Sequence, residues 1–499
     1  MPTTHPLRFA ALLAAAVVFA SGCSVLGSTS TTMFPDATVP QPPSSTLDPS
    51  AATTTTATAT TATTTTTGGT ATTTTTSGGV SAAVVGCDEA EPPFTALCES
   101  IELIEDRFVD PVDLDALAAA AVAAIEAEEA SGDANDVVVC AVPDAAFVAV
   151  CDAAQVEVSD GGEVEVVVNE AIAGMVSELD DPFSAYLSPE TMELRDEELT
   201  GEVSGIGAFV SAQEDDGEDV VACDLLSTTC RIVVISTIPG SPAEDAGLRP
   251  GDVMVSVDGE SMAGMTFDES TARVRGEEGT EVTIGVERDG ETFELTIERK
   301  SVVFPVAIGQ MTDPGVGYLR LSVFTETAPE QFRQALSDLL DAGAETIVLD
   351  LRGNPGGSLS AAIDIASEFL ADGEVLETDG PTFDKVFEVT GPGVATDPDI
   401  DVIILLDSGS ASASEVVAGA LQERGRAVVV GESSVGKNTV QQTFRLPGGG
   451  GLKITIARWL TPERRDYGGT GLSPDAEIEL PFDLLPEQLT DLAIESVAG

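Results

Sequence analysis

The chain has 499 residues, with 85 acidic against 22 basic side chains and a formal net charge of −63. So large a negative charge excludes binding to the phosphate backbone of nucleic acids. The only histidine is His5, in a segment that we expect to be removed on export. The mature protein therefore lacks a Ser-His-Asp triad and histidine-ligated zinc, and we expect no metal or cofactor.

Residues 1–22 predict a signal peptide. Arg8 precedes an apolar core at residues 9–20, which is too short to span a bilayer. The sequence Ala20-Ser21-Gly22-Cys23 resembles a lipobox, which implies that Cys23 is lipidated and anchors the protein to the outer face of the cell membrane. Cleavage without lipidation is the alternative. The Thr/Ala-rich remainder of residues 23–85 cannot bury a core, so it predicts a disordered tether.

Six further cysteines fall in three pairs that are close in sequence: Cys87 and Cys98, Cys140 and Cys151, and Cys223 and Cys230. Outside the cytoplasm, an even and clustered set favours disulfide bonds. Six cysteines allow many connectivities, of which sequential pairing is the simplest.

Residues 86–200 predict an N-terminal helical domain. Segment 114–130 is rich in alanine and segment 169–179 has an apolar helical pattern. Between them, the valine-rich residues 137–168 predict an insertion with a small β element. The second helix leads into the sequence Asp-Asp-Pro-Phe-Ser-Ala-Tyr-Leu at residues 180–187.

Residues 201–300 predict a small β-rich domain. A glycine-led loop contains Gly205, Ile206, Gly207 and Ala208, and residues 240–259 follow a helix-turn-strand pattern. Both features resemble a PDZ domain. The resemblance implies that backbone N–H groups of the four loop residues bind the terminal carboxylate of a peptide.

Residues 301–485 predict an α/β core, followed by a C-terminal tail at residues 486–499. Strands are expected at 316–323, 346–351, 403–407 and 427–430, and helices at 329–342 and 415–424. A glycine-rich loop, Arg-Gly-Asn-Pro-Gly-Gly, follows the second strand at residues 352–357.

The Ser/Ala/Gly turn at residues 408–414 predicts a nucleophile. A serine just before a helix is expected to be exposed beside unpaired N–H groups that can stabilise an oxyanion. Without histidine, the serine needs another base. Lys437 follows a buried strand and a glycine-flanked turn, where burial can lower the pKa of a lysine amine.

Two alternatives overlap this lysine. Residues 431–437 are similar to the beginning of a P-loop, but Asn438 replaces the hydroxyl residue that binds magnesium, and a strand pattern follows. Ser434-x-x-Lys437 is similar to the S-x-x-K motif of penicillin-recognising enzymes. That motif lies on a helix, which Gly436 disfavours.

Taken together, residues 95–480 resemble the C-terminal processing peptidases, also called tail-specific proteases. Their S-A-S-A-S-E motif implies that Ser412 is the nucleophile, and their G-K-G-x-V-Q motif implies that Lys437 is the base. Gln441 matches the glutamine that orients the amine in the family. Asn438 departs from the family glycine.

The same resemblance implies an oxyanion hole. In the family, one donor is the N–H group that follows the nucleophile, which is Ala413 here. The other is a glycine of the D-L-R-x-N-x-G-G loop, which we assign to Gly356, with Gly357 as the alternative.

We therefore expect an α/β (α+β multidomain) protein in which a PDZ domain is inserted between an N-terminal helical segment and a serine-peptidase core. The expected function is that of an exported serine endopeptidase that cleaves proteins near apolar C-termini. A homo-oligomer is left open. The alternative is a catalytically inactive PDZ adaptor, which would need none of Ser412, Lys437 and Gln441.

Overall fold

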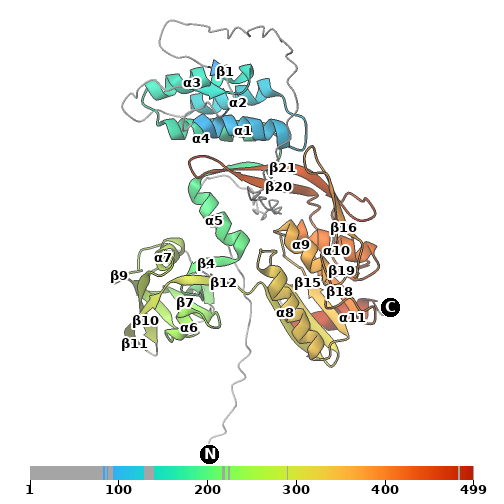
Figure 1. Cartoon of the computed structure of the whole chain (residues 1–499). Helices are drawn as coiled ribbons and strands as arrows, with labels where there is room; N and C mark the ends of the chain where they lie inside the picture. The colour runs from blue at the N-terminus through green and yellow to red at the C-terminus, as the bar shows by residue number, and fades with distance from the viewer. Residues whose placement is uncertain are drawn as a thin grey trace, which may run out of the picture.

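The computed structural model describes residues 83–84, 87, 94–127, 140–215, 220–222, 225–288, 290–481 and 484–497. The signal peptide, Cys23 and nearly all of the tether lie outside these ranges. A helical domain, a β-rich domain and an α/β body are arranged around an extended antiparallel sheet (Figure 1). Across the described ranges, no helix has the length and apolar content needed to cross a membrane.

In the described part of the N-terminal domain, the helices are α1 (Phe94–Arg107), α2 (Leu114–Ala127), α3 (Val148–Ser159) and α4 (Val164–Ser177). Disulfide bonds join Cys87 to Cys98 and Cys140 to Cys151, in agreement with sequential pairing. Cys230 is also disulfide-bonded, and its expected partner Cys223 lies outside the described residues.

The small β element expected within residues 137–168 is present as the two-residue strand β2 (Ala141–Val142). Strand β1 (Ala83–Val84) pairs with β2, but the rest of the described segment is mainly α3 and the start of α4. Val150, Ala154 and Val158 are buried at helical spacing. Packing of this face against the domain core has outweighed the strand preference of valine.

The β-rich domain is built on a sheet with the strand order β11-β10-β8-β7-β5-β6, and β9 pairs with β8. It has its own apolar core. Its elements are β5 (Ala208–Asp215), β6 (Val220–Ala222), β7 (Cys230–Thr237), α6 (Pro242–Asp245), β8 (Val253–Val257), β9 (Glu260–Ser261), α7 (Phe267–Val274), β10 (Glu281–Arg288) and β11 (Glu291–Glu298). The chain enters and leaves through an antiparallel pair, β4 (Glu202–Gly205) and β12 (Lys300–Val303).

The α/β body contains a six-stranded sheet that is parallel except at one edge. Its strand order is β13 (Ala307–Asp313), β14 (Val316–Leu321), β15 (Thr346–Asp350), β18 (Asp401–Leu406), β19 (Val428–Gly431) and β22 (Ala476–Glu477). Its helices are α8 (Ala328–Asp341), α9 (Leu359–Ser367), α10 (Ala413–Glu423) and α11 (Pro486–Val497).

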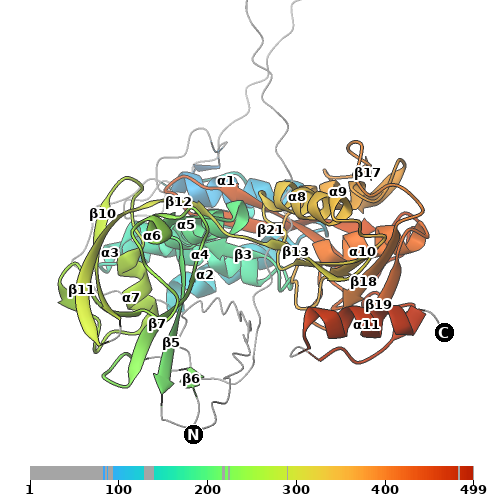
Figure 2. The ribbon, with the colours of Figure 1, turned by 90° about the horizontal axis from the view of Figure 1, so that it is seen from below.

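Both faces of this sheet are covered, which explains why its strands are continuous apolar runs. Leu349 and Ile404 pack in the cluster that includes residues of α8, α9 and α10. Their neighbours Val348 and Ile403 pack with Leu489 of α11 on the opposite face. Figure 2 shows α8 and α11 on opposite sides of the sheet. Residues 486–497, which were expected to be a C-terminal tail, are therefore a helix that packs against the sheet.

A second, antiparallel sheet lies between the helical domain and the α/β body (Figure 1). Its strands are β17 (Lys385–Glu388), β16 (Glu374–Asp379), β21 (Gly451–Leu460) and β20 (Thr439–Arg445), and β3 (Ala185–Leu187) pairs with β21. Helix α5 (Pro189–Thr200) continues from β3 towards the β-rich domain. In this sheet β21 pairs both with β20, which follows Lys437, and with β3 of the N-terminal region.

Candidate active site

Three loops meet at the carboxyl ends of adjacent parallel strands. Residues 351–358 follow β15, residues 407–412 follow β18, and residues 432–438 follow β19. The carboxyl edge of a parallel sheet is where α/β proteins usually bind ligands. The predicted nucleophile, base and oxyanion loop come from these three loops.

Ser412 immediately precedes α10 and has an unusual backbone conformation. Its φ is +53°, and it is one of four described non-glycine residues with positive φ. Such strain is concentrated at functional sites in proteins. The side chain is only 2% exposed, so the expectation of an exposed serine is wrong. The surrounding loops cover it.

Glu415, which sequence reasoning missed, connects the loop that ends at Ser412 to the loop that contains Lys437. The buried carboxylate accepts hydrogen bonds at Oε2 from Ser412 N–H (2.6 Å) and Lys437 N–H (2.9 Å). Its Oε1 accepts from Gly436 N–H (2.6 Å) and Ser434 Oγ. Burial raises the pKa of Glu415, and these four hydrogen bonds oppose the rise. The S-x-x-E spacing of a helix cap was the available signal.

Lys437 is buried, with 2% of its surface exposed. Its Nζ lies 4.8 Å from the centre of the Phe183 ring. Its carbonyl oxygen accepts a hydrogen bond from Trp459 Nε1 at 3.0 Å. Residues 433–438 form no helix, and strand β20 follows them. These facts remove both the P-loop and the S-x-x-K alternatives.

Gln441 is fully buried on β20. Its Nε2 donates to Thr439 Oγ1 at 2.8 Å and to Thr455 Oγ1 at 3.0 Å. Its Oε1 is buried and has no hydrogen-bond partner among the described residues. The side-chain amide is thus held by its nitrogen, and its oxygen is left as an acceptor.

The glycine-rich loop lies directly against Ser412 at Gly356, which has a φ of +105°. A Cβ atom at this position would lie 2.9 Å from Ser412 Cβ and 3.0 Å from Ala413 N. A Cβ atom at Gly357 would instead meet the Phe324 carbonyl oxygen at 2.2 Å. In this conformation Gly356 N–H donates to Asn354 Oδ1 at 2.9 Å. An oxyanion could use that donor only if this bond were shared or broken.

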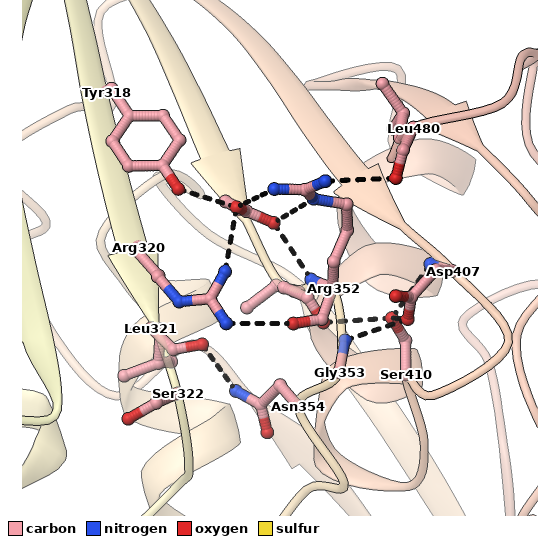
Figure 3. A network of polar contacts seen from close by, with 12 residues as sticks. Tyr318, Arg320, Leu321, Ser322, Arg352, Gly353, Asn354, Asp407, Ser410 and Leu480 are labelled. Atoms are coloured by element: carbon pink, nitrogen blue, oxygen red, sulfur yellow. Dashed lines mark hydrogen bonds and ion pairs between the residues drawn. The ribbon is translucent and has the colours of Figure 1, made fainter. Parts of the chain in front are cut away.

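A buried ionic network supports the start of this loop (Figure 3). Asp350 accepts hydrogen bonds from Tyr318 Oη at 2.6 Å, Arg320 Nη1 at 3.0 Å and Arg352 Nε at 2.9 Å. Burial alone would raise the pKa of Asp350, but hydrogen bonding to Arg352 and the positive charges of Arg352 and Arg320 lower it below 3.8. Arg352 Nη1 also donates to the carbonyl oxygen of Leu480 at 3.1 Å.

Asp407 joins the ends of β15 and β18. Its Oδ1 accepts from Gly353 N–H at 2.8 Å and from Gly409 N–H at 2.9 Å. Ser410 Oγ donates to the Leu351 carbonyl oxygen at 2.9 Å. The glycine-rich loop and the loop of residues 407–412 are therefore fixed to each other.

The predicted peptide-binding loop lies in the β-rich domain, away from these three loops. Gly205 ends β4 and Ala208 begins β5. The carbonyl oxygens of Ile206 and Gly207 accept hydrogen bonds from Ala243 N–H (2.7 Å) and Ile238 N–H (3.0 Å). The structure therefore brings the four loop residues together, but in a different domain from Ser412.

Comparison with known proteins agrees with this architecture. Residues 315–478 match the model of peptidase family S41, and residues 233–288 match that of the PDZ domain. A carboxyl-terminal-processing protease of Synechocystis is 35% identical over 319 residues, covering 62% of this chain and 71% of that protein. The carboxy-terminal processing protease CtpA of Bacillus subtilis is 34% identical over 318 residues, covering 63% of this chain and 64% of its own length.

The chain thus spans slightly less than two thirds of the Bacillus relative. Among solved structures, a photosystem II D1 C-terminal processing protease is similar at 24% identity, with a TM-score of 0.43, over 78% of this chain and 94% of its own. On the sequence matches, the chain belongs to the carboxy-terminal processing proteases of peptidase family S41.

Proposed function

We propose that the protein is an exported serine endopeptidase that cleaves polypeptides near their C-termini with a Ser412/Lys437 dyad. One observation carries the proposal. Glu415 Oε2 binds the backbone N–H groups of both Ser412 and Lys437, and so ties the nucleophile loop to the base loop at the edge of the sheet.

In the proposed reaction, neutral Lys437 takes the proton of Ser412 Oγ, and this oxygen attacks the peptide carbonyl carbon. Ala413 N–H, and Gly356 N–H once released from Asn354, stabilise the oxyanion. Lys437 then protonates the leaving amine. In the second half of the reaction, Lys437 takes a proton from water, which attacks the acyl-enzyme, and then returns the proton to Ser412 Oγ. Gln441 Oε1 accepts a hydrogen bond from the lysine amine and orients it.

We propose that the β-rich domain binds the C-terminus of the substrate. The loop at Gly205, Ile206, Gly207 and Ala208 would bind the terminal carboxylate of a protein or peptide with an apolar C-terminus. Cys23 would hold the enzyme at the outer face of the cell membrane. Cys23→Ala should therefore move the protein from the membrane to the soluble fraction, and an unchanged membrane fraction would refute the anchor.

The catalytic proposal is tested by cleavage of an unfolded substrate with an apolar C-terminus, together with labelling by a fluorophosphonate probe. The natural protein should cleave the substrate and be labelled at Ser412, whereas Ser412→Ala should do neither. Ser408→Ala is the matched control, because Ser408 is an exposed serine of the same turn. Tail binding without cleavage or labelling by the natural protein would support the inactive-adaptor alternative.

A further inference from the structure

We propose that Asp181 and Thr455 are positioning residues that fix the side-chain amide of Gln441 in the orientation needed by Lys437. The proposal rests on the proposed Ser412/Lys437 mechanism and adds to it a contribution from the N-terminal region. Asp181 lies in the turn between α4 and β3, whereas Thr455 lies on β21.

A continuous hydrogen-bond chain connects these residues. Thr455 Oγ1 donates to Asp181 Oδ2 at 2.6 Å, and Gln441 Nε2 donates to Thr455 Oγ1 at 3.0 Å. Thr455 and Gln441 are 1% and 0% exposed. Water therefore cannot readily replace either bond.

Which group donates and which accepts along this hydrogen-bond chain follows from the protons that each group carries. An ionised carboxylate only accepts hydrogen bonds, so the single proton of the Thr455 hydroxyl is committed to Asp181. The oxygen of that hydroxyl can then only accept, and its neighbour must be the nitrogen of Gln441. A reversed amide would place Oε1 against two threonine oxygens, and Thr455 would have no proton to offer it.

The orientation leaves Gln441 Oε1 as the free end of the amide. Both Nε2 hydrogens are used by Thr439 and Thr455, while Oε1 is buried and has no partner among the described residues. A buried acceptor without a donor is costly, which makes this oxygen a prepared site for the amine of Lys437. Asp181, acting through Thr455, thus determines the position of the acceptor oxygen, Gln441 Oε1.

The turn that carries Asp181 is itself ordered against the site. Asp181 also accepts from Phe183 N–H at 3.2 Å and from Ser184 Oγ at 2.6 Å. Ser184 Oγ accepts from Thr455 N–H at 3.2 Å. Phe183, in the same turn, places its ring 4.8 Å from Lys437 Nζ. One turn therefore contacts both the lysine and the residue that holds its glutamine.

The test compares Asp181→Asn and Thr455→Val with the natural protein in peptide cleavage. The first change introduces an amide that can present N–H₂ to Thr455, and the second removes the hydroxyl at similar volume. Each change should lower kcat about tenfold or more while KM stays within about twofold. Thr455→Ser keeps the hydroxyl and should retain most activity. Asp180→Asn changes an exposed neighbouring carboxylate and should have no effect.

A double-mutant cycle separates positioning from a general structural role. If Asp181 acts through Gln441, adding Asp181→Asn to Gln441→Ala should cause no further loss in the rate of Ser412 labelling by a fluorophosphonate. Additive losses would overturn the proposal. Unfolding midpoints identify any variant that does not fold. One folded variant, at either Asp181 or Thr455, is sufficient to test the proposal.

The outcomes also separate this proposal from the one on which it rests. Natural rates in Asp181→Asn and Thr455→Val, with Ser412→Ala inactive, would overturn the positioning role and leave the dyad intact. An active Ser412→Ala protein would overturn the dyad.

Discussion

The backbone N–H groups of Ser412 and Lys437 donate to the same oxygen atom, Glu415 Oε2, at 2.6 and 2.9 Å. One residue begins helix α10 and the other precedes strand β20. A single buried carboxylate therefore holds both residues, and a backbone hydrogen bond from Val435 N–H to the Ser410 carbonyl oxygen (3.0 Å) joins the same two loops.

Glu415→Gln should impair the enzyme and its stability together. An amide keeps only one acceptor oxygen, so at least one of the four donors around Glu415 is left buried and unpaired, which costs about 1–3 kcal/mol per group. We expect kcat to fall more than tenfold and the free energy of unfolding to fall by a few kcal/mol. Glu432→Gln, at an exposed acid in the same loop as Lys437, is the control. If Glu415→Gln had the kcat of the natural protein, the Glu415 carboxylate would not be needed to hold Ser412 and Lys437 in place.

Gly356→Ala should abolish turnover. The added methyl group would lie within 3.0 Å of Ser412 Cβ and Ala413 N, so Ser412 and the glycine-rich loop must separate. Loss of one oxyanion donor alone lowers kcat about 10²- to 10³-fold. Gly448→Ala introduces a methyl group at a similar φ of +94° where no atom lies within 4 Å. It should cost about 1–2 kcal/mol of stability and leave kcat unchanged. Equal kcat values for the two variants would contradict the assignment.

Asp350 should contribute a pH-dependent part of the stability. The pKa of this carboxyl in the folded protein is below its ordinary value of 3.8, so the contribution is present above about pH 3.8 and is lost as the pH falls through the lower folded value. Asp350→Asn should remove this component, which the natural protein loses as the pH falls below about 3.8. At neutral pH it should cost about 3–5 kcal/mol, because buried Arg352 loses its partner.

Denaturant unfolding at several pH values measures this effect. Asp372→Asn, at a side chain that is 91% exposed, should keep the acid-side slope of the natural protein. An unchanged slope in Asp350→Asn would show that Asp350 titrates alike in the folded and unfolded chains.

The Cys140–Cys151 bond should stabilise the helical domain. It closes a loop between residues 11 positions apart, for which chain-entropy estimates give about 3 kcal/mol. Replacing both cysteines by serine should therefore lower the free energy of unfolding by about 2–3 kcal/mol. Mass mapping of the non-reduced mature protein should find Cys140 linked to Cys151. Free thiols at both positions would contradict this prediction.

The α/β core could be predicted from the sequence because its strands are buried on both faces. The expected strand 346–351 is β15 (Thr346–Asp350), and the expected helix 415–424 is α10 (Ala413–Glu423). The helix α3 in the valine-rich segment was not predicted, because valine favours strands and tertiary packing of Val150 and Val158 at helical spacing decided the outcome.

The supporting contacts of the site could not be predicted in the same way. Thr455 and Asp181 are 274 positions apart in the chain, and no local pattern relates them. Ser412 and Lys437 were found because short motifs carry them, whereas the burial of Ser412 depends on loops from other strands.

Substitution of the base tests the central claim most directly. Lys437 must be neutral to accept a proton from Ser412, whereas a free lysine amine, with a pKa of about 10.4, is charged at neutral pH. Arginine stays charged in proteins and cannot accept the proton. Cleavage of an unfolded substrate with an apolar C-terminus would be measured for Lys437→Arg, Ser412→Ala and the exposed control Lys385→Arg. The dyad predicts that Lys437→Arg folds and is as inactive as Ser412→Ala, while Lys385→Arg cleaves normally. A Lys437→Arg protein that still cleaves would show that another group is the base.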